Sequence, residues 1–466
     1  MIEQLTHHPR TAAVVLAAGR GTRFRSATPK VLHPAAGRSL LGHVLGALAP
    51  LGLERVLVVV SPDGADVEDE VAAWDARMAQ PVTTVVQPQQ LGTGDALDVA
   101  LRALPDDVDR VLVLPGDTPL LRPETLAALL AVDPELPLGM LTTVLDEPDG
   151  YGRVLRDADG AVVGIVENRD ADAAQRRITE VNAGMYVLDR AVVQPLVAAL
   201  GSDNAQGERY LTDVVAALAA SGPGAGAVAA PAAEVAGVND RVQLAAAAGV
   251  LRRRHLHDLM RAGVSVVDPD HTYVDVDVTV GAESVLLPGT ILEGTTSIGE
   301  RATIGPSSHL TDCSVGDDAV VHSTRADGAS IGEGVDVGPF AHLRPGTRID
   351  DGARVGAFVQ TKNATIGAGA KLPHLAYVGD AEVGAGANVA CGVVTVNYDG
   401  REKHRTVIGE GAFIGCGTML VAPVTIGQRA FIGAGSTITE DVPSEALAIA
   451  RARQVTKEGR AAGRLG

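Results

Sequence analysis

The 466-residue sequence is poor in aromatic and sulfur-containing side chains and carries no excess of positive charge. Only 3% of the residues are aromatic, and the three cysteines, Cys313, Cys391 and Cys416, form neither a paired disulfide framework nor a metal-ligand spacing. The formal net charge of -18 argues against nucleic-acid binding, because phosphate backbones require basic surfaces. We therefore expect a reducing compartment, and we expect any anionic ligand to be held by local groups.

Long apolar runs are also missing. No segment approaches the roughly 20 apolar residues of a membrane span. The first residues, MIEQLTHHPR, are polar and lack the apolar centre of a signal peptide. These absences predict a cytoplasmic protein without membrane insertion. The hydrophobic fraction of 46% beside 21% charged residues is typical of globular chains, and the length predicts at least two domains.

The carboxyl-terminal half contains a strict repeat of six residues. Aliphatic residues recur at every sixth position, and the positions after them are often glycine. A parallel β-helix of hexapeptide repeats has this period, because each flat side buries one aliphatic residue per hexapeptide. The repeat occurs in three phases: Val274, Val280, Leu286, Leu292, Ile298, Ile304 and Leu310; Ile331, Val337, Leu343, Ile349 and Val355; Ile408, Ile414, Leu420, Ile426, Ile432 and Ile438.

The amino-terminal half alternates apolar runs with helical stretches. Such alternation predicts an α/β domain with a mostly parallel, Rossmann-like sheet. The expected strands are 12–17, 56–60, 82–86 and 111–114, and the expected helices are 40–51 and 94–104. A segment rich in helix formers, 242–261, is expected to join the halves as one helix. We predict domains at 1–241 and 263–466 with a helical linker at 242–262.

Two motifs in the amino-terminal half carry chemistry. In LAAGRGTRFRSATPK, a buried strand leads into glycines whose backbone amides can approach phosphate, and Arg23 and Lys30 follow as candidate counter-charges. Taken alone, this loop is better explained as an ordinary strand-to-helix turn. In LPGDTPL, Asp117 follows a strand, at the sheet edge where active-site carboxylates of α/β proteins lie. The alternative for Asp117 is a helix cap before Pro119.

In the second half, the six-residue phase fails between Val396 and Ile408, across NYDGREKHRT. A polar loop expelled from regular coils is a frequent location for function, although it can also be a tolerated surface insertion. Nearby segments contain four polar candidates in a short stretch: Lys362, His374, Tyr377 and Asn388.

Taken in order, these segments resemble the bifunctional bacterial enzymes that make UDP-N-acetylglucosamine. The similarity spans Ala12 to Lys457. It implies an α/β nucleotidyltransferase domain followed by a left-handed parallel β-helix, although parallel crossovers are right-handed as a rule. The motifs that carry it are LAAGRGTR with Pro29 and Lys30, QLGTGDA, LPGDTPL, YGRV, GIVENRDA, VNAGMY, NAQGERYLTD and GVNDRVQL, then VGAFVQTKNATIG, KLPHLAYVGDAEVG and GANVACG.

The resemblance implies two activities: acetylation of glucosamine 1-phosphate by acetyl-coenzyme A, and transfer of UMP from UTP to N-acetylglucosamine 1-phosphate with release of pyrophosphate. Such enzymes supply precursors of peptidoglycan and the cell envelope. The resemblance further implies Mg²⁺ as cofactor, UTP and acetyl-coenzyme A as co-substrates, and a homotrimer whose acetyl site is completed between subunits.

For uridylyl transfer, the resemblance implies that Lys30 is catalytic and neutralises phosphate together with Arg23. Two oxygen ligands, from Asp117 and Asn239, would suit a hard cation such as Mg²⁺. The loop backbone would line the nucleotide site, amide and backbone groups would recognise uracil, and a third group would contact N-acetylglucosamine. The loop residues are Leu16, Ala17, Ala18 and Gly19, and the uracil residues are Gln87, Gly92 and Thr93. The residues expected at N-acetylglucosamine are Gly152, Glu167 and Asn182.

For acetyl transfer, the resemblance implies that His374 is the general base, which suits an imidazole that titrates near neutral pH. Arg344, Lys362, Tyr377 and Asn388 would bind the sugar phosphate, and Lys403 is a further candidate for coenzyme A phosphates. The acetyl-coenzyme A path would be lined by Cys391, Asn397, Tyr398, Cys416, Ala434 and Arg451.

Four positions depart from the family pattern. Pro115 replaces a polar or aromatic residue, and Gln360 replaces a common glutamate near the phosphate site. Cys391 stands where alanine is frequent, and its contact would come from the backbone. Cys416 stands where serine is frequent, so that a hydroxyl contact becomes a weaker thiol contact. None of these changes removes the expected base.

Two alternatives stay open on the sequence alone. One is a monofunctional sugar nucleotidyltransferase whose β-helix is structural or regulatory. The presence of His374, Lys362 and NYDG argues against it. The other is a non-catalytic scaffold, which the combined presence of Lys30, Asp117 and Asn239 argues against.

Overall fold

The computed structural model describes residues 10–19, 21–222 and 224–461, and the chain divides into two compact units, 1–251 and 252–466. The polar segment 1–9, on which the signal-peptide prediction rests, lies outside the described residues. Over the described ranges, no helix has both the length and the hydropathy needed to cross a bilayer.

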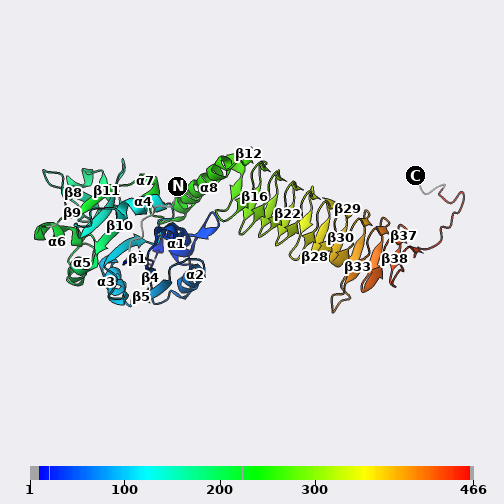
Figure 1. The fold of residues 1–466 in the computed structure, drawn as a ribbon, viewed down its shortest axis with the longest axis horizontal. Coiled ribbons are helices and arrows are strands. Elements are labelled where there is room, and N and C mark those ends of the chain that lie inside the picture. The colour runs from blue at the N-terminus through cyan, green and yellow to red at the C-terminus, as the bar shows by residue number, and fades with distance from the viewer. Residues whose placement is uncertain (1–9, 20, 223, 462–466) are drawn as a thin grey trace. The chain divides into compact units, whose positions relative to one another are not determined.

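The first unit is built on a mostly parallel sheet in the order β11-β7-β10-β6-β1-β4-β5 (Figure 1). The neighbours β1–β4, β1–β6, β4–β5 and β7–β11 run parallel, and β10 runs antiparallel to both of its neighbours. The expected strands are present. The bounds are β1 Thr11–Leu16, β4 Arg55–Val60, β5 Val82–Val86, β6 Arg110–Pro115, β7 Leu138–Val144, β10 Glu180–Asp189 and β11 Gly226–Ala229.

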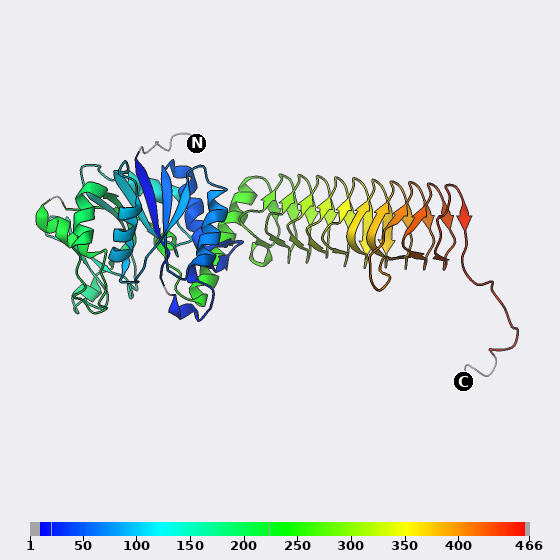
Figure 2. The same cartoon turned by 90° about the horizontal axis from the view of Figure 1, so that it is seen from below.

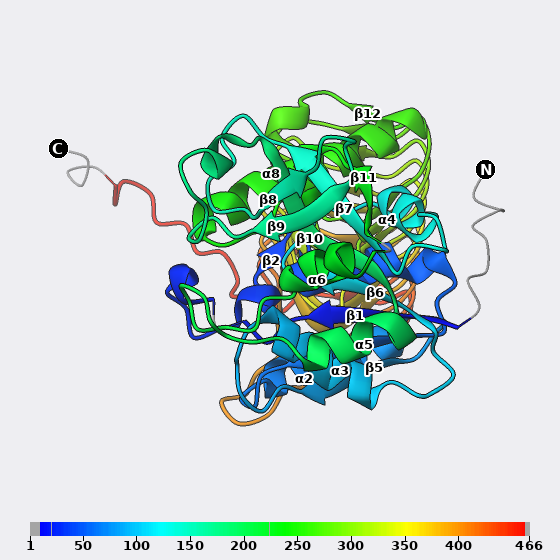
Figure 3. The same ribbon diagram turned by 90° about the vertical axis from the view of Figure 1, so that its left-hand side faces the viewer.

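Helices cover both faces of this sheet, and Figure 3 looks onto this unit. The apolar faces of α1 (Leu40–Leu48), α2 (Ala65–Asp75) and α4 (Pro123–Leu130) pack on one face of the sheet. The opposite face is covered by α3 (Thr93–Ala103), α5 (Arg190–Ala198) and α6 (Asp213–Ser221). A small antiparallel pair, β8 (Arg153–Arg156) and β9 (Val162–Val166), branches from β10. The result is the three-layer α/β arrangement that the sequence predicts.

The helix expected to join the halves is α8, Arg241–Arg261. Ala247 and Leu251 pack into an apolar cluster of the first unit, and Leu256 and Leu259 pack into the core of the second. The domain bounds of 1–241, 242–262 and 263–466 stay a prediction.

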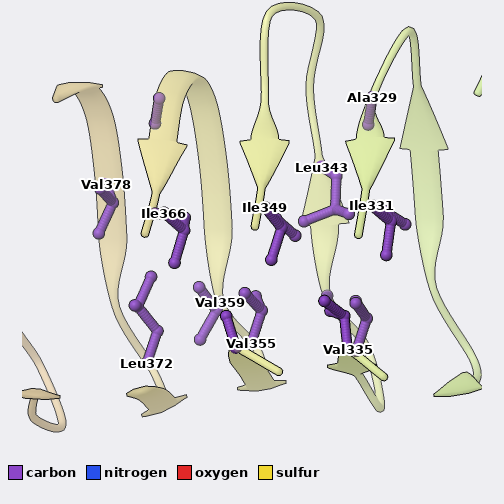
Figure 4. Close-up of a cluster of buried hydrophobic side chains, with 14 of the residues drawn as sticks. Ala329, Ile331, Val335, Leu343, Ile349, Val355, Val359, Ile366, Leu372 and Val378 are labelled. Atoms are coloured by element: carbon purple, nitrogen blue, oxygen red, sulfur yellow. The ribbon is translucent and has the colours of Figure 1, made fainter. Parts of the chain in front are cut away.

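The second unit is a stack of β-helical coils with strands of two or three residues on most sides (Figure 2). All strand pairs in it run parallel and in register, as when Val274 pairs with Leu292 and Leu286 with Ile304. The repeating aliphatic residues point inward and form one continuous core, as the close-up in Figure 4 shows for Ile331, Leu343 and Leu372. Val280, near the start of the stack, is only partly buried.

Shortened coils explain why the six-residue period changes phase. Leu292 pairs with Leu310, eighteen positions on, whereas Leu310 pairs with Ala326, only sixteen positions on. The coil closes with fewer residues at its corners and still places one aliphatic side chain on each flat side. The hexapeptide prediction is therefore confirmed across the gap between its first two phases.

Loss of one of these inward side chains should weaken the β-helix. Leu372 is fully buried, so Leu372→Ala should lower the free energy of unfolding by about 2–5 kcal/mol, through lost burial and the cavity left behind. The neighbouring Lys371 is exposed, so Lys371→Ala should change this free energy by no more than about 0.5 kcal/mol. Chemical denaturation of the full chain followed by circular dichroism measures both. Equal effects of the two substitutions would contradict the assignment of Leu372 to the core.

Candidate functional sites

The first candidate site lies at the carboxyl ends of β1 and β6. These strands are parallel neighbours, with Leu16 paired with Pro115, so the segments that follow them emerge at the same sheet edge. The amide of Gly116 donates a hydrogen bond of 2.9 Å to the carbonyl of Leu16, which ties the two exits together. The loop of Leu16, Ala17, Ala18 and Gly19 and the carboxylate of Asp117 therefore share one edge.

Four polar side chains meet at this edge. The Lys30 ammonium donates to the Asp117 carboxylate and, at 3.3 Å, to the amide oxygen of Asn239. Arg23 donates to the same oxygen at 2.9 Å. The amide of Val238 donates to the carbonyl of Asp117 at 2.9 Å, which holds the segment bearing Asn239 against the loop after β6. Residues far apart in the sequence thus form one cluster of two cations and two oxygen ligands.

The oxygen ligands of this cluster fit a hard divalent cation. A carboxylate and an amide oxygen are ligand types that Mg²⁺ accepts, and this ion usually fills its remaining positions with water and substrate phosphate. Among the described residues, no group of three or more His, Cys, Asp or Glu side chains could hold a metal by itself. A cation held by Asp117 and Asn239 would accordingly depend on phosphate oxygens to complete its shell.

The segment expected to recognise uracil packs against the loop. Gln90 donates to the carbonyl of Ala18 at 2.6 Å, and Gln87 donates to Asp95 at 2.8 Å and to the carbonyl of Gly92 at 3.3 Å. Gly92 has a φ of 112°, and a Cβ there would lie 2.7 Å from the carbonyl oxygen of Arg209. This position therefore requires glycine, both for its backbone conformation and for the close approach.

Thr93 begins α3 immediately after Gly92, and its hydroxyl accepts from the amide of Leu211 at 3.2 Å. The segment of Gln87, Gly92 and Thr93 is thus fixed by contacts on both sides.

The three residues expected at the sugar lie together on the β8–β9–β10 side of the unit. The amide of Asn182 donates to the carbonyl of Gly152 at 2.9 Å, and a Cβ on Gly152 would stand 3.5 Å from a carboxylate oxygen of Glu167. Burial raises the pKa of Glu167, and a hydrogen bond from the Thr212 hydroxyl at 3.0 Å opposes the rise only in part. The Asn182 side chain donates to the hydroxyl of Tyr186 at 2.7 Å.

Three side chains of this region were not singled out from the sequence. Gln90 anchors the glycine-containing loop, Thr212 contacts Glu167, and Tyr151 lies beside Asp117. Burial raises the pKa of Tyr151, and a backbone hydrogen bond with Gly237 opposes the rise. All three stand within the motifs QLGTGDA, YGRV and NAQGERYLTD, but only the three-dimensional contacts distinguish them from their neighbours.

The second candidate site lies on the β-helix, where β28 (Gln360–Ile366) pairs with β30 (Tyr377–Val383). Lys362 lies opposite Gly379, and the neighbouring Lys403 lowers the pKa of Lys362, with a smaller contribution from Arg344. Burial would raise the pKa of Asp380, yet hydrogen bonds from Asn363 and Asn397 and the two lysines lower it. Two lysines, Lys362 and Lys403, therefore act on one ionised carboxylate, that of Asp380.

Gly379 provides space for Tyr377. A Cβ on Gly379 would collide with the hydroxyl of Tyr377 and stand 3.0 Å from the amide nitrogen of Asn397. Its backbone is held from within the coil by Thr395, whose hydroxyl accepts from the amide of Gly379 at 2.8 Å and donates to its carbonyl at 3.0 Å. Thr361 and Thr395 are fully buried at inward positions that are aliphatic in most coils. Polar anchoring thus replaces apolar packing in the coils that carry this site.

The expelled loop lies between β32 (Val394–Val396) and β33 (Thr406–Ile408), where the repeat fails in the sequence, and it protrudes beside β33 in Figure 1. Its shape is fixed locally. Asp399 accepts from the amides of Arg401 and Glu402 at 2.7 Å each and pairs with His404 at 2.8 Å, and these contacts lower the pKa of Asp399.

Across this loop, Tyr398 and Lys403 form an antiparallel bridge. Lys403 is thereby placed beside Lys362 and lines a pocket of about 250 Å³ together with Asn363 and Asp380.

His374, Cys391, Cys416 and Ala434 form a column on successive coils. The exposed His374 is the last residue of β29 (Lys371–His374). Backbone hydrogen bonds join the members of the column, or the residues that follow them, from one coil to the next. The amide of Gly392 donates to the carbonyl of Leu375 at 2.9 Å, that of Gly417 to Cys391 at 2.7 Å, and that of Gly435 to Cys416 at 2.8 Å. Arg451 then donates to the carbonyl of Ala434 at 2.7 Å.

Asn388 is separated from the other residues expected at the sugar phosphate. It lies in β31 (Asn388–Val389) of the 11-stranded sheet, whereas Lys362 and Tyr377 lie in the 17-stranded sheet, and Arg344 follows a strand of that second sheet. One chain therefore presents these groups on different flat sides of the β-helix.

Comparison with known proteins identifies both halves. The model of the MobA-like NTP transferase domain matches residues 13–207, and the bacterial transferase hexapeptide model, with six repeats, matches residues 405–440. The chain is 50% identical over 455 residues to the bifunctional protein GlmU of Mycolicibacterium vanbaalenii, covering 96% of this chain and 92% of that protein. It is 51% identical over 449 residues to GlmU of Alkalilimnicola ehrlichii, with 96% and 95% covered.

A third relative, GlmU of a Geobacillus species, is 46% identical over 451 residues, with 96% of each chain covered. The fold class expected from the sequence is confirmed by these matches and by the parallel pairing of the strands. The hexapeptide repeats agree with a left-handed parallel β-helix.

The raised pKa of Glu167 makes stability depend on pH. A carboxyl whose pKa is higher in the folded than in the unfolded protein contributes stability below its unfolded pKa, and this contribution is lost as the pH rises through the folded pKa. From about pH 4 upward, the melting temperature of the parent should therefore fall relative to that of Glu167→Gln, because glutamine cannot ionise. Differential scanning calorimetry across this range measures the difference, with exposed Glu147→Gln as control. A pH-independent difference would contradict the raised pKa.

Proposed function

Because the chain belongs to the GlmU family of bifunctional proteins, we propose that its two units carry out successive steps of UDP-N-acetylglucosamine synthesis. The second unit acetylates glucosamine 1-phosphate with acetyl-coenzyme A. The first unit couples the product to UTP and releases pyrophosphate. The sequence-based prediction of a bifunctional transferase is confirmed by relatives matched over nearly the full chain, which favour it over a nucleotidyltransferase with a purely structural β-helix.

For uridylyl transfer, the proposal uses the cluster at the ends of β1 and β6. A phosphate oxygen of N-acetylglucosamine 1-phosphate attacks the α-phosphate of UTP, and pyrophosphate leaves. Lys30 and Arg23, which already converge on Asn239, stabilise the negative charge that develops on the phosphates. The loop of Leu16 to Gly19 contributes backbone amides. The residues that we assign to the sugar, Gly152, Glu167 and Asn182, orient the acceptor.

We assign Asp117 and Asn239 as the protein ligands of Mg²⁺. When bound, this ion supplies charge neutralisation at the phosphates. The Lys30 ammonium lies against both of these ligands. The same lysine can move its charge toward a phosphate when a substrate occupies the edge.

For acetyl transfer, the amine of glucosamine 1-phosphate attacks the thioester carbonyl, and coenzyme A leaves as the thiol. His374 accepts the proton of the amine, and the backbone amide at Cys391 donates to the developing oxyanion. The sugar phosphate is bound by Arg344, Lys362 and Tyr377, and Lys403 strengthens the positive charge beside Lys362. The column from Cys391 to Ala434, with Arg451, forms the path of acetyl-coenzyme A, to which we also assign Asn397 and Tyr398.

A homotrimer accounts for the position of Asn388. This side chain lies in a different sheet from Lys362 and Tyr377, so one chain does not gather the complete sugar-phosphate set. Cyclic packing of identical β-helices brings one flat side of a subunit against another flat side of its neighbour. A site between subunits would combine Asn388 of one chain with Lys362 of the next.

Family membership together with the two side-chain clusters carries the proposal. Its direct test is chromatographic detection of free coenzyme A after mixing the protein with acetyl-coenzyme A and glucosamine 1-phosphate, beside pyrophosphate release from UTP and N-acetylglucosamine 1-phosphate. Both products should appear, each only with its sugar substrate. Pyrophosphate without coenzyme A would leave a uridylyltransferase with a structural β-helix.

Asp117→Ala should lower pyrophosphate formation about 100-fold or more, because it removes the carboxylate that we assign as a ligand of Mg²⁺ and so weakens charge neutralisation at the phosphates. Coenzyme A release should stay at the parent rate, since Asp117 lies in the other unit. The exposed Asp106 follows α3 and provides a matched control in Asp106→Ala, which should retain both activities. Loss of both activities in a folded Asp117→Ala protein would contradict the two-site assignment.

His374→Ala should have the converse effect. Loss of a general base lowers the rate by about 100- to 10,000-fold, so coenzyme A release should fall while pyrophosphate formation stays unchanged. His257→Ala, at an exposed position of α8, is the control. Parent-like acetylation by His374→Ala would remove His374 from the role of base.

A further inference from the structure

Cys391 and Cys416 occupy equivalent positions on neighbouring coils. In the pairing of β31 with β34 (Phe413–Ile414), Val389 lies opposite Ile414, and each cysteine follows its strand by two residues. The register continues past the strands, because the amide of Gly417 donates to the carbonyl of Cys391 at 2.7 Å. The two thiols are therefore direct neighbours along the axis of the β-helix.

Their spacing and exposure suit a disulfide. Adjacent parallel strands lie about 4.8 Å apart, within the Cα separation of about 4.4–6.8 Å that disulfides span. Both cysteines are free, Cys416 is exposed and Cys391 is partly exposed. Cys313 provides a contrast, because it is buried in the core, burial raises the pKa of its thiol, and the thiol donates to the carbonyl of Thr311. A buried thiol of raised pKa is the less reactive kind.

We propose that Cys391 and Cys416 form a reversible disulfide when exposed to a peroxide, and that this oxidation switches off acetyl transfer. One thiolate attacks a peroxide oxygen, which gives a sulfenic acid and one water after proton transfer. The second thiol attacks the sulfenic sulfur and expels a second water, so the two thiols lose two electrons to one hydrogen peroxide. A dithiol reductant restores both thiols by thiol–disulfide exchange and is itself oxidised to a cyclic disulfide.

The position of this bond explains why it would affect one activity. Cys391 and Cys416 stand between His374 and Ala434 in the column that we assign to acetyl-coenzyme A, so the inference rests on the proposed function of this site. The bond would also close the coil that carries the expelled loop and Lys403. A displacement of about 1 Å in positioning groups can cost about 100-fold in rate. Uridylyl transfer uses residues of the other unit.

The first measurement is a tryptic digest of the full chain after hydrogen peroxide treatment, without reduction and with free thiols blocked. Cleavage after Lys371, Arg401, Arg405 and Arg429 separates the peptides 372–401 and 406–429, which each hold one of the two cysteines. Mass spectrometry should detect them linked, and dithiothreitol should release them. The peptide 302–325, with Cys313, should carry a blocked thiol throughout. Oxidation of Cys391 or Cys416 to sulfinic acid without any linked peptide would overturn the proposal.

The second measurement follows both activities of the same samples, each expressed relative to the reduced form of the same protein. Peroxide should lower coenzyme A release by the parent about 100-fold, leave pyrophosphate formation unchanged, and be reversed by dithiothreitol. Cys391→Ala should form no link and show no reversible, disulfide-dependent loss. The matched control Cys313→Ser should behave as the parent.

Two results separate this inference from the proposed function. A linked parent that still acetylates at its reduced rate would overturn the switch. A reduced parent that releases no coenzyme A with glucosamine 1-phosphate would overturn the proposed acetyl transfer, while the linked peptides would still establish the disulfide.

Discussion

The in-register stacking of coils is the constraint on which the second half of this protein depends. Every strand hydrogen-bonds to the equivalent strand of the next coil, so an inward residue such as Leu343 must be followed by another inward residue one coil later. The coils tolerate a missing residue at a corner, but not a change of register on a flat side. The buried hydroxyl of Thr395 enters the core with its hydrogen bonds met by the backbone of Gly379. Thr395 belongs to β32, in the coils that carry the candidate acetyl site.

A different geometric rule organises the first half. In a parallel sheet the carboxyl ends of neighbouring strands share one edge, so loops that are far apart in the sequence lie close together there. The exits of β1 and β6 are joined by the bond from Gly116 to Leu16, and the segment bearing Asn239 is tied to Asp117 through Val238. The two halves thus form their candidate sites in different ways. One gathers a site at the end of strands, and the other interrupts a regular repeat.

Much of this architecture could be predicted because it rests on periodic patterns. The six-residue spacing identifies the inward side chains, and the apolar runs identify the strands of the sheet. Asp117 could be placed from its position after a strand. The phase changes could not be predicted, since a coil shortened between Leu310 and Ala326 leaves no marker other than the lost period. The pairing of Lys362 with Lys403 was equally hidden, because the course of the expelled loop depends on local hydrogen bonds to Asp399.

The contact of Lys30 with Asp117 and Asn239 has a consequence for the order of events. The ammonium acts as an internal counter-ion to the carboxylate of Asp117. A divalent cation coming alone would face competition from this tethered positive charge. A cation arriving with a polyphosphate would not, because the phosphate offers the displaced ammonium a new anionic partner. If Asp117 and Asn239 hold the metal as proposed, the site would favour joint loading of metal and nucleotide, with the Lys30 ammonium moving from the carboxylate to a phosphate.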